Sequence, residues 1–153
     1  WKPAVSILKP VRGADEGFLE AIRTHARIDY PEFEILFGRY DPADPSRRAI
    51  EQLQREFPNV AIRIVDCPTV APNAKVGTLQ DLAAVARHSV LVVNDSDISV
   101  PHDYLYRLVT SLLTPGTGLV TCLYRASAAS CHPMESYASA ARNPHSMRNL
   151  SSA

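Results

Sequence analysis

The chain has 153 residues, of which 46% are apolar and 21% charged, and its 16 basic residues balance its 16 acidic ones. This size and composition are typical of one globular domain, and they exclude a disordered chain, a collagen and a coiled coil. The balanced charge removes the electrostatic basis for binding nucleic acid, so we expect no nucleic-acid partner.

The cysteines are too few and too scattered for a disulfide framework, and their odd number leaves one unpaired (Cys67, Cys122 and Cys131). We therefore expect reduced thiols in a cytosolic compartment. No apolar run reaches the roughly 18 residues that a membrane span needs, and no signal peptide opens the sequence. Because the chain begins with Trp1, we interpret it as a portion of a longer protein.

Short apolar runs alternate with helical patterns along the first 125 residues. The runs predict strands at 4–8, 34–40, 60–65, 89–93 and 119–124, and the helical patterns predict helices at 15–28, 44–57, 77–88 and 101–113. This alternation predicts an α/β fold with a mostly parallel sheet and right-handed crossovers. The strand at 60–65 alternates in polarity and is placed near the sheet edge, whereas 89–93 is continuously apolar and is expected to be buried on both faces.

The pattern ends near Arg125. Ala and Ser supply 14 of the 28 residues from 126 to 153, and no apolar stripe persists there. We therefore predict a partial α/β domain over 1–125, followed by a poorly ordered tail over 126–153. An unfinished sheet has an open edge, which invites pairing with a second copy of the chain.

Carboxylates follow two of the predicted strands, at the edge where open α/β sheets bind ligands. Asp95 and Asp97 come directly after the strand at 89–93, and two carboxylates there need a positive partner. A hard divalent ion such as Mg²⁺ or Mn²⁺ fits, because it takes one or two carboxylates and completes its shell with phosphate oxygens and water. The alternative is a polar turn in which Asp95 accepts hydrogen bonds from backbone amides.

Two further residues are candidates at the same edge. Asp41 follows the strand at 34–40 and can accept a hydrogen bond from the ring N–H of a base such as uracil, or it can simply shape a turn. Lys75 precedes a predicted helix and can meet a phosphate or balance the aspartates, or it can be a solvated loop lysine. The sequence contains no zinc-type histidine spacing, glycine-rich dinucleotide or P-loop motif, or hydrolase elbow.

Four segments in this order resemble GT-A glycosyltransferases of families 2 and 21, including ceramide glucosyltransferases and bacterial enzymes of hopanoid biosynthesis. They are Pro3–Pro10, the turn at Asp41, Pro72–Val76 and Val93–Ile98. The resemblance covers about residues 1–125, the front part of such an enzyme. It implies a Rossmann-like GT-A fold and an inverting, metal-dependent transfer of sugar from a nucleotide sugar, UDP-linked, to a lipid acceptor.

The resemblance also implies roles for single residues. Pro10, Asp41, Lys75 and Asp95 would bind the nucleotide sugar, with Asp41 at the base, and Asp95 and Asp97 would hold Mg²⁺ or Mn²⁺ against the diphosphate. A further carboxylate would deprotonate the acceptor hydroxyl. The site would face the cytoplasm, since full-length relatives of this kind are membrane-associated, although this chain has no membrane span.

The sequence departs from that family in its last part. The family's third acidic residue and its later Trp-containing motif find no match, because the only acid beyond Tyr124 is Glu135 and the only tryptophan is Trp1. The catalytic base is therefore unassigned, and we expect this chain to be the donor-binding part. Two other hypotheses stay open: a non-catalytic Mg²⁺-binding or signalling α/β module, and a nucleotidyltransferase.

Overall fold

Strands and helices alternate strictly in the computed structural model, which describes residues 2–123. The described elements are β1 (Val5–Val11), α1 (Phe18–Ala26), β2 (Phe33–Arg39), α2 (Ser46–Glu56), β3 (Ala61–Asp66), α3 (Ala74–Val85), β4 (Val90–Val93) and α4 (Tyr104–Leu112). All of them belong to the compact unit Trp1–Val120. The predicted α/β class is confirmed, and the predicted boundary near Arg125 and the tail at 126–153 lie outside the described residues.

The four strands described in this unit form one sheet in the order β3-β2-β1-β4, and every neighbouring pair is parallel. The register sets Leu8 of β1 beside Leu36 of β2 and Val93 of β4. Because all strands run the same way, their carboxyl ends meet at one edge of the sheet. The expected edge position of residues 60–65 is confirmed, since β3 is an outer strand.

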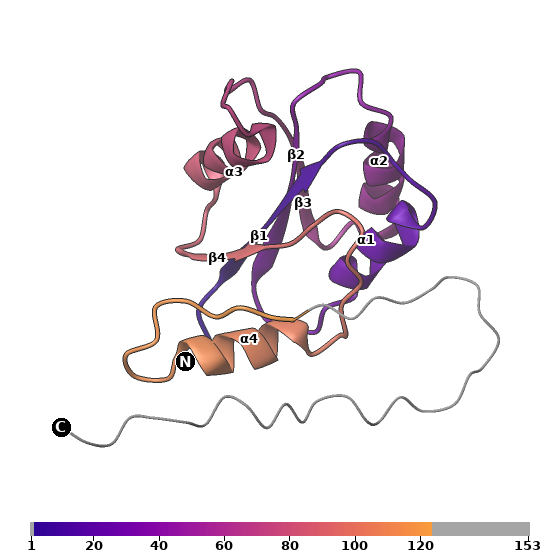
Figure 1. The fold of residues 1–153 in the computed structure, drawn as a ribbon. Helices are drawn as coiled ribbons and strands as arrows, with labels where there is room; N and C mark the ends of the chain where they lie inside the picture. The colour runs from indigo at the N-terminus through magenta and orange to yellow at the C-terminus, as the bar shows by residue number, and fades with distance from the viewer. Residues whose placement is uncertain (1, 124–153) are drawn as a thin grey trace, which may run out of the picture. The chain divides into compact units, whose positions relative to one another are not determined.

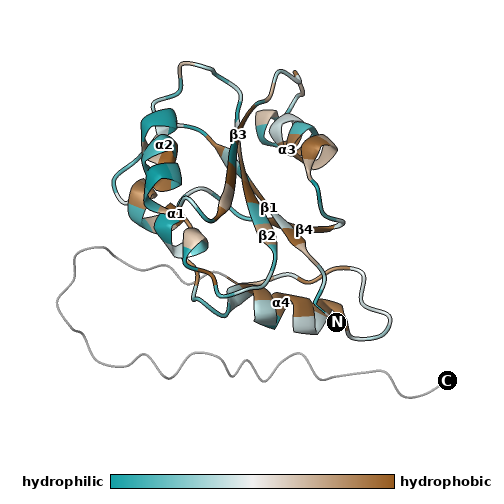
Figure 2. Ribbon diagram, turned by 180° about the vertical axis from the view of Figure 1, so that it is seen from behind, coloured by the Kyte–Doolittle hydropathy of each residue, from teal (hydrophilic) through white to brown (hydrophobic). Residues whose placement is uncertain are grey.

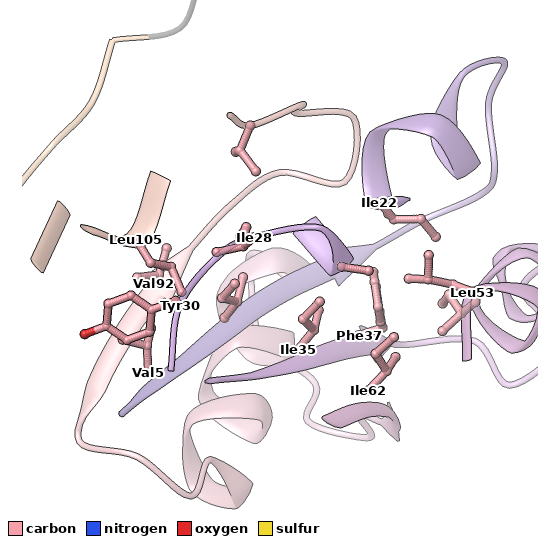
Figure 3. Close-up of a cluster of buried hydrophobic side chains, with 14 of the residues drawn as sticks. Val5, Ile22, Ile28, Tyr30, Ile35, Phe37, Leu53, Ile62, Val92 and Leu105 are labelled. Carbon is pink, nitrogen blue, oxygen red and sulfur yellow. The ribbon is translucent and has the colours of Figure 1, made fainter. Parts of the chain in front are cut away.

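Helices cover both faces of the sheet, with α1 and α2 on one side and α3 on the other (Figure 1). The larger core lies on the α1 and α2 face, where side chains from every strand meet those of α1, α2 and α4 (Figure 3). A smaller cluster lies under α3 and contains Leu8, Leu36, Cys67 and Leu82. Strands with apolar side chains on both faces therefore lie between helices, of which α2 is coloured mostly hydrophilic in Figure 2 and α3 is mixed.

One glycine allows α3 to pack closely on β2. A Cβ atom added at Gly38 would lie 2.6 Å from Cγ2 of Thr78 and 2.8 Å from Cδ1 of Leu82. The missing side chain therefore fixes the distance between β2 and α3, the helix that carries Lys75.

Strand β4 is not the buried strand that its apolar sequence predicts. Val92 is buried, but Leu91 and Val93 are 44% and 47% exposed, because β4 is an edge strand and α3 packs over β1 and β2 instead. The most buried strands are the two central ones, β1 and β2.

Two further expectations are corrected by the structure. Residues 119–123 form no strand, and Tyr124, the last residue of that predicted strand, lies outside the described residues. Helix α3 begins at Ala74 rather than Gly77, because the Asn73 side chain accepts hydrogen bonds from the backbone N–H groups of Lys75 and Val76 and so caps the helix earlier. Among residues 2–123, no helix has the length and apolar character needed to cross a bilayer.

Candidate functional site

The candidate site lies where β1 and β4 separate at the carboxyl edge of the sheet. The β1–β4 ladder ends at the pair Leu8 and Val93, while β1 continues to Val11 beside β2 alone. The strand order reverses here, since the chain passes from β1 to β2 and β3 on one side and then crosses from β3 to β4 on the other side of β1. Open α/β sheets bind ligands at such a reversal of strand order. The loops after β1, β2 and β4 thus begin at the same edge of the sheet.

Asp95 and Lys75 meet at this edge. Nζ of Lys75 forms an ion pair with Oδ1 of Asp95, and the two side chains are 50% and 44% exposed. Lys75 stands in the first turn of α3, where the cap at Asn73 fixes its backbone. A half-exposed pair of this kind contributes at most about 1 kcal/mol to stability, so both groups can turn toward a ligand at little cost.

A second lysine, Lys9, contacts Asp95 from inside the protein. Lys9 is fully buried in β1, and its Nζ donates to the main-chain oxygen of Asp95 at 2.8 Å and lies 3.2 Å from Nε2 of His25. Nδ1 of His25 lies 3.2 Å from the main-chain oxygen of Ala21, so Nδ1 carries the proton and Nε2 accepts from Lys9. Lys9 thus joins three segments distant in sequence, namely β1, α1 and the loop after β4.

Burial controls the charge of this pair. It lowers the pKa of Lys9 to about 7, and the negative charges of Asp95 and Asp97 oppose that shift. Burial and the neighbouring Lys9 lower the pKa of His25 to about 3, so the imidazole is neutral at physiological pH. A neutral His25 is the partner that a buried lysine needs, because a second positive charge would repel it.

Asn94 ties the loop after β4 to its surroundings. This buried residue donates from its backbone to the main-chain oxygen of Leu8 at 3.2 Å and from Nδ2 to the hydroxyl of Tyr104 at 2.9 Å. Its side chain also raises the pKa of His25. The residue immediately before Asp95 is therefore anchored to both β1 and α4.

The loop after β2 is built around two aspartates. Asp41 is exposed, and its Oδ1 accepts the backbone N–H of Ala43 at 2.8 Å, which is the turn that the alternative interpretation describes. Asp44 accepts from the backbone of Ser46 at 2.9 Å, at the start of α2, and from Gly13 at 2.7 Å. Burial would raise the pKa of Asp44, but the bonds from Ser46 and Gly13 outweigh it and lower the pKa. Asp44 thus joins the loops after β1 and β2.

A buried arginine supports the same loop. Arg39, the last residue of β2, donates from Nη1 to the main-chain oxygen of Pro42 at 3.0 Å and pairs through Nη2 with Oδ1 of Asp66 at 2.6 Å. Its guanidinium fixes the backbone next to Asp41 from inside the protein. Among the described residues, no hydrogen bond or ion pair joins Asp41 directly to Asp95.

The two remaining candidates lie at the same edge. Pro10 is half-buried and pairs with Gly38 of β2, beyond the end of the β1–β4 ladder, so its missing N–H removes no ladder bond on the β4 side. Asp97 is exposed in the loop after β4. The prediction that Asp95 and Asp97 follow a strand buried on both faces is wrong, because β4 is an edge strand.

Sequence reasoning assigned no role in the site to four buried polar residues beneath it, namely Lys9, His25, Arg39 and Asn94, nor to the half-buried Asp44. A signal was present for Lys9, which shares the strand period of Val5 and Ile7 and must point into the same core. His25 likewise falls on the buried stripe of α1 with Phe18 and Ile22. A polar residue at an apolar position of a strand or helix therefore indicates a buried polar partner.

The carboxylates suit a hard divalent ion. Asp95 and Asp97 offer oxygen ligands at the surface, and within residues 2–123 no group of three or more His, Cys, Asp or Glu side chains could hold a metal. Two carboxylates do not make a closed structural zinc site, and an ion such as Mg²⁺ or Mn²⁺ held by them would need phosphate oxygens and water as its further ligands.

Comparison with known proteins gives a consistent family. The model of glycosyl transferase family 21 matches residues 1–135. Ceramide glucosyltransferase 1 of Caenorhabditis elegans is 25% identical over 113 residues, which are 73% of this chain and 24% of that protein. The ceramide glucosyltransferase of Komagataella phaffii is 29% identical over 113 residues, or 71% of this chain and 22% of that enzyme. The chain thus spans about a quarter of the length of these curated relatives.

Among solved structures, the mannosyltransferase PcManGT of Pyrobaculum calidifontis, in complex with GDP-Man and Mn²⁺, has the same fold. Its TM-score is 0.70 at 23% identity, and the match covers 82% of this chain and 36% of that chain. The fold is therefore that of the GT-A glycosyltransferases.

Proposed function

Because this chain belongs to glycosyl transferase family 21, we propose that it forms the donor-binding part of an enzyme that transfers a sugar from a UDP-linked donor to a lipid acceptor. The matched relatives act on ceramide by name, which supports a lipid acceptor. The mannosyltransferase with the same fold is complexed with a nucleotide sugar and Mn²⁺, which supports the donor class and a divalent metal.

One observation carries the assignment. The ion pair between Lys75 and Asp95 stands at the reversal of strand order, and the Asp41 loop follows the adjacent β1–β2 pair at the same edge. A diphosphate at this point would meet Lys75, and a base would extend over the end of β1 toward Asp41. Pro10 would line the floor between them. The family match also favours a transferase over a signalling module.

The reaction that we propose is an inverting displacement. The acceptor hydroxyl oxygen attacks the anomeric carbon, the bond from that carbon to the diphosphate oxygen breaks, and UDP leaves with the electron pair. The hydroxyl proton passes to a carboxylate base, which we do not assign to any residue of this chain. Asp95 and Asp97 would hold Mg²⁺ or Mn²⁺, which when bound neutralises the charge of the departing diphosphate.

Calorimetric titration of the chain with UDP-glucose, with and without Mn²⁺, tests the proposal. We expect binding that needs Mn²⁺, and an Asp95→Ala variant that loses at least 100-fold in affinity, because it removes both a metal ligand and the partner of Lys75. The matched control is Asp29→Ala, which removes an exposed aspartate from the loop before β2, at the other edge of the sheet. Binding that ignores both the metal and Asp95→Ala would contradict the assignment.

Two further parts of the proposal concern surroundings. We propose that the donor site faces the cytoplasm, and the free thiols of Cys67 and Cys122 agree with a reducing compartment.

Pairing of two copies through an open sheet edge also stays a prediction. In the described sheet β4 is an outer strand with Leu91 and Val93 exposed, so sedimentation of the Leu91→Lys variant beside the original chain checks it.

A further inference from the structure

A buried lysine in the centre of a sheet needs an explanation. Lys9 lies in the central strand β1, on the face that carries Val5, Ile7 and Val11, and it is fully buried. Taking a lysine amine out of water costs free energy, which is expressed here as its lowered pKa. A methionine of similar length would fill the same space without that cost, so the stability of the sheet does not explain the lysine.

The contacts of Lys9 point toward the candidate site. One hydrogen bond goes to Nε2 of His25, which is itself held by Ala21 within α1. The other goes to the main-chain oxygen of Asp95. Lys9 therefore links a rigid helix to the one loop in which Asp95 and Asp97 stand.

The choice of acceptor atom is informative. Lys75 binds the carboxylate of Asp95, whereas Lys9 binds its main-chain oxygen. Lys9 therefore fixes the position of the backbone and leaves the carboxylate oxygens available to a ligand. Asn94, the residue before Asp95, is held by β1 and by α4, so the backbone is fixed on two sides just where the carboxylates begin.

We propose that Lys9 is a positioning residue of the donor site: by hydrogen bonding to the main chain at Asp95, with His25 as its second partner, it aims the Asp95 and Asp97 carboxylates at the metal–diphosphate end of the donor. The proposal rests on the proposed function above. It assigns Lys9 no contact with the base, which would lie on the Asp41 side.

The substitution Lys9→Met tests this role through two ligands. Uridine, followed by NMR titration, reports the base side, and UDP-glucose with Mn²⁺, followed by calorimetry, reports the diphosphate side. We expect the dissociation constant of UDP-glucose to rise at least tenfold, with a higher Mn²⁺ concentration at half-saturation, while that of uridine changes less than twofold. A purely structural role would weaken both ligands together.

Ser6→Ala is the matched control, because it removes another buried polar group from the same strand at the opposite end. We expect it to bind both ligands as the original chain does. If circular dichroism shows that Lys9→Met is unfolded, Lys9→Gln, which keeps a donor on a shorter side chain, is expected to give the same split with a smaller amplitude.

Unchanged UDP-glucose binding in the folded Lys9 variant, or a parallel loss of uridine binding, would overturn the role of Lys9. An original chain that does not bind UDP-glucose contradicts the proposed function itself. The two failures are therefore distinguishable.

Discussion

Two buried polar clusters lie at opposite ends of the same sheet, and they differ in how completely the protein satisfies them. At the amino end, Glu34 of β2 is buried and accepts hydrogen bonds from Oγ of Ser6 at 2.7 Å, the backbone of Arg87 at 2.7 Å and Nη1 of Arg63 at 3.4 Å. Burial would raise the pKa of Glu34, but these donors outweigh it and lower the pKa. The anion is enclosed by protein groups.

At the carboxyl end the buried group is the amine of Lys9, and the anions are at the surface. Asp95 is half exposed, and Asp41 and Asp97 are exposed. The difference teaches how to separate a structural cluster from a binding site, since both contain charges on a central sheet. A cluster whose charges are all paired inside holds the fold, whereas one whose carboxylates keep free acceptor positions can take a ligand.

The largest effect is expected from breaking the amino-end cluster. Glu34→Ala leaves the Ser6 hydroxyl and the Arg87 N–H without their acceptor and removes the carboxylate partner of Arg63, so we expect a loss of about 3 kcal/mol in the free energy of unfolding. Urea denaturation measures the loss. The affinity for UDP-glucose of the protein that remains folded should not change, and a change there would contradict the division between the two ends.

A pH titration separates the clusters without a ligand. In the unfolded chain His25 binds a proton below pH 6.5, whereas in the folded chain its imidazole stays neutral down to about pH 3. The free energy of unfolding therefore falls as the pH decreases through this window. We expect a loss of about 2 kcal/mol between pH 7 and pH 5 from this group. The pKa of Glu34 is also lowered, so the stability that its carboxylate contributes is lost only as the pH falls below the usual pKa of 4.5.

Urea denaturation at pH 7, 6 and 5 checks this expectation. A His25→Gln variant should show a much flatter dependence over this range, because glutamine does not titrate. An equally steep fall in that variant would show that another group causes the acid sensitivity.

The smallest effect on stability is expected at the surface of the site. Lys75→Met removes a half-exposed ion pair and should change the free energy of unfolding by less than about 1 kcal/mol. The same change should weaken UDP-glucose about tenfold, because it removes a cation beside the diphosphate. Lys2→Met, at an exposed lysine that donates to Tyr106, is the control and should leave affinity unchanged in calorimetry.

Much of the fold could be predicted because strand and helix periods are local properties of the chain. All eight described elements begin within three residues of their predicted start. The run at 119–123 could not be interpreted correctly in this way. An apolar run indicates that a strand is possible, but pairing with a neighbouring strand decides whether one forms.

The candidate site, like the fold, could be predicted only in part from the sequence. The positions of Asp41 and Asp95 at the carboxyl edge follow from the ends of the strands, and the contact of Lys75 with Asp95 agrees with the expectation that it balances the aspartates. The partners of Lys9 could not be predicted. His25 and Asp95 lie 16 and 86 residues away from it along the chain, and only the packing of α1 and β4 around β1 brings them together.

By itself the sequence determined the order of the elements, the parallel sheet and the edge at which its carboxylates gather, because these depend on residue period and on strand direction. Only the tertiary structure decided that β4 is an outer strand, that Lys9 rather than Lys75 is the buried lysine, and that Glu34 is enclosed while Asp95 is open. Burial depends on which distant segments cover a side chain, and no local pattern carries that information.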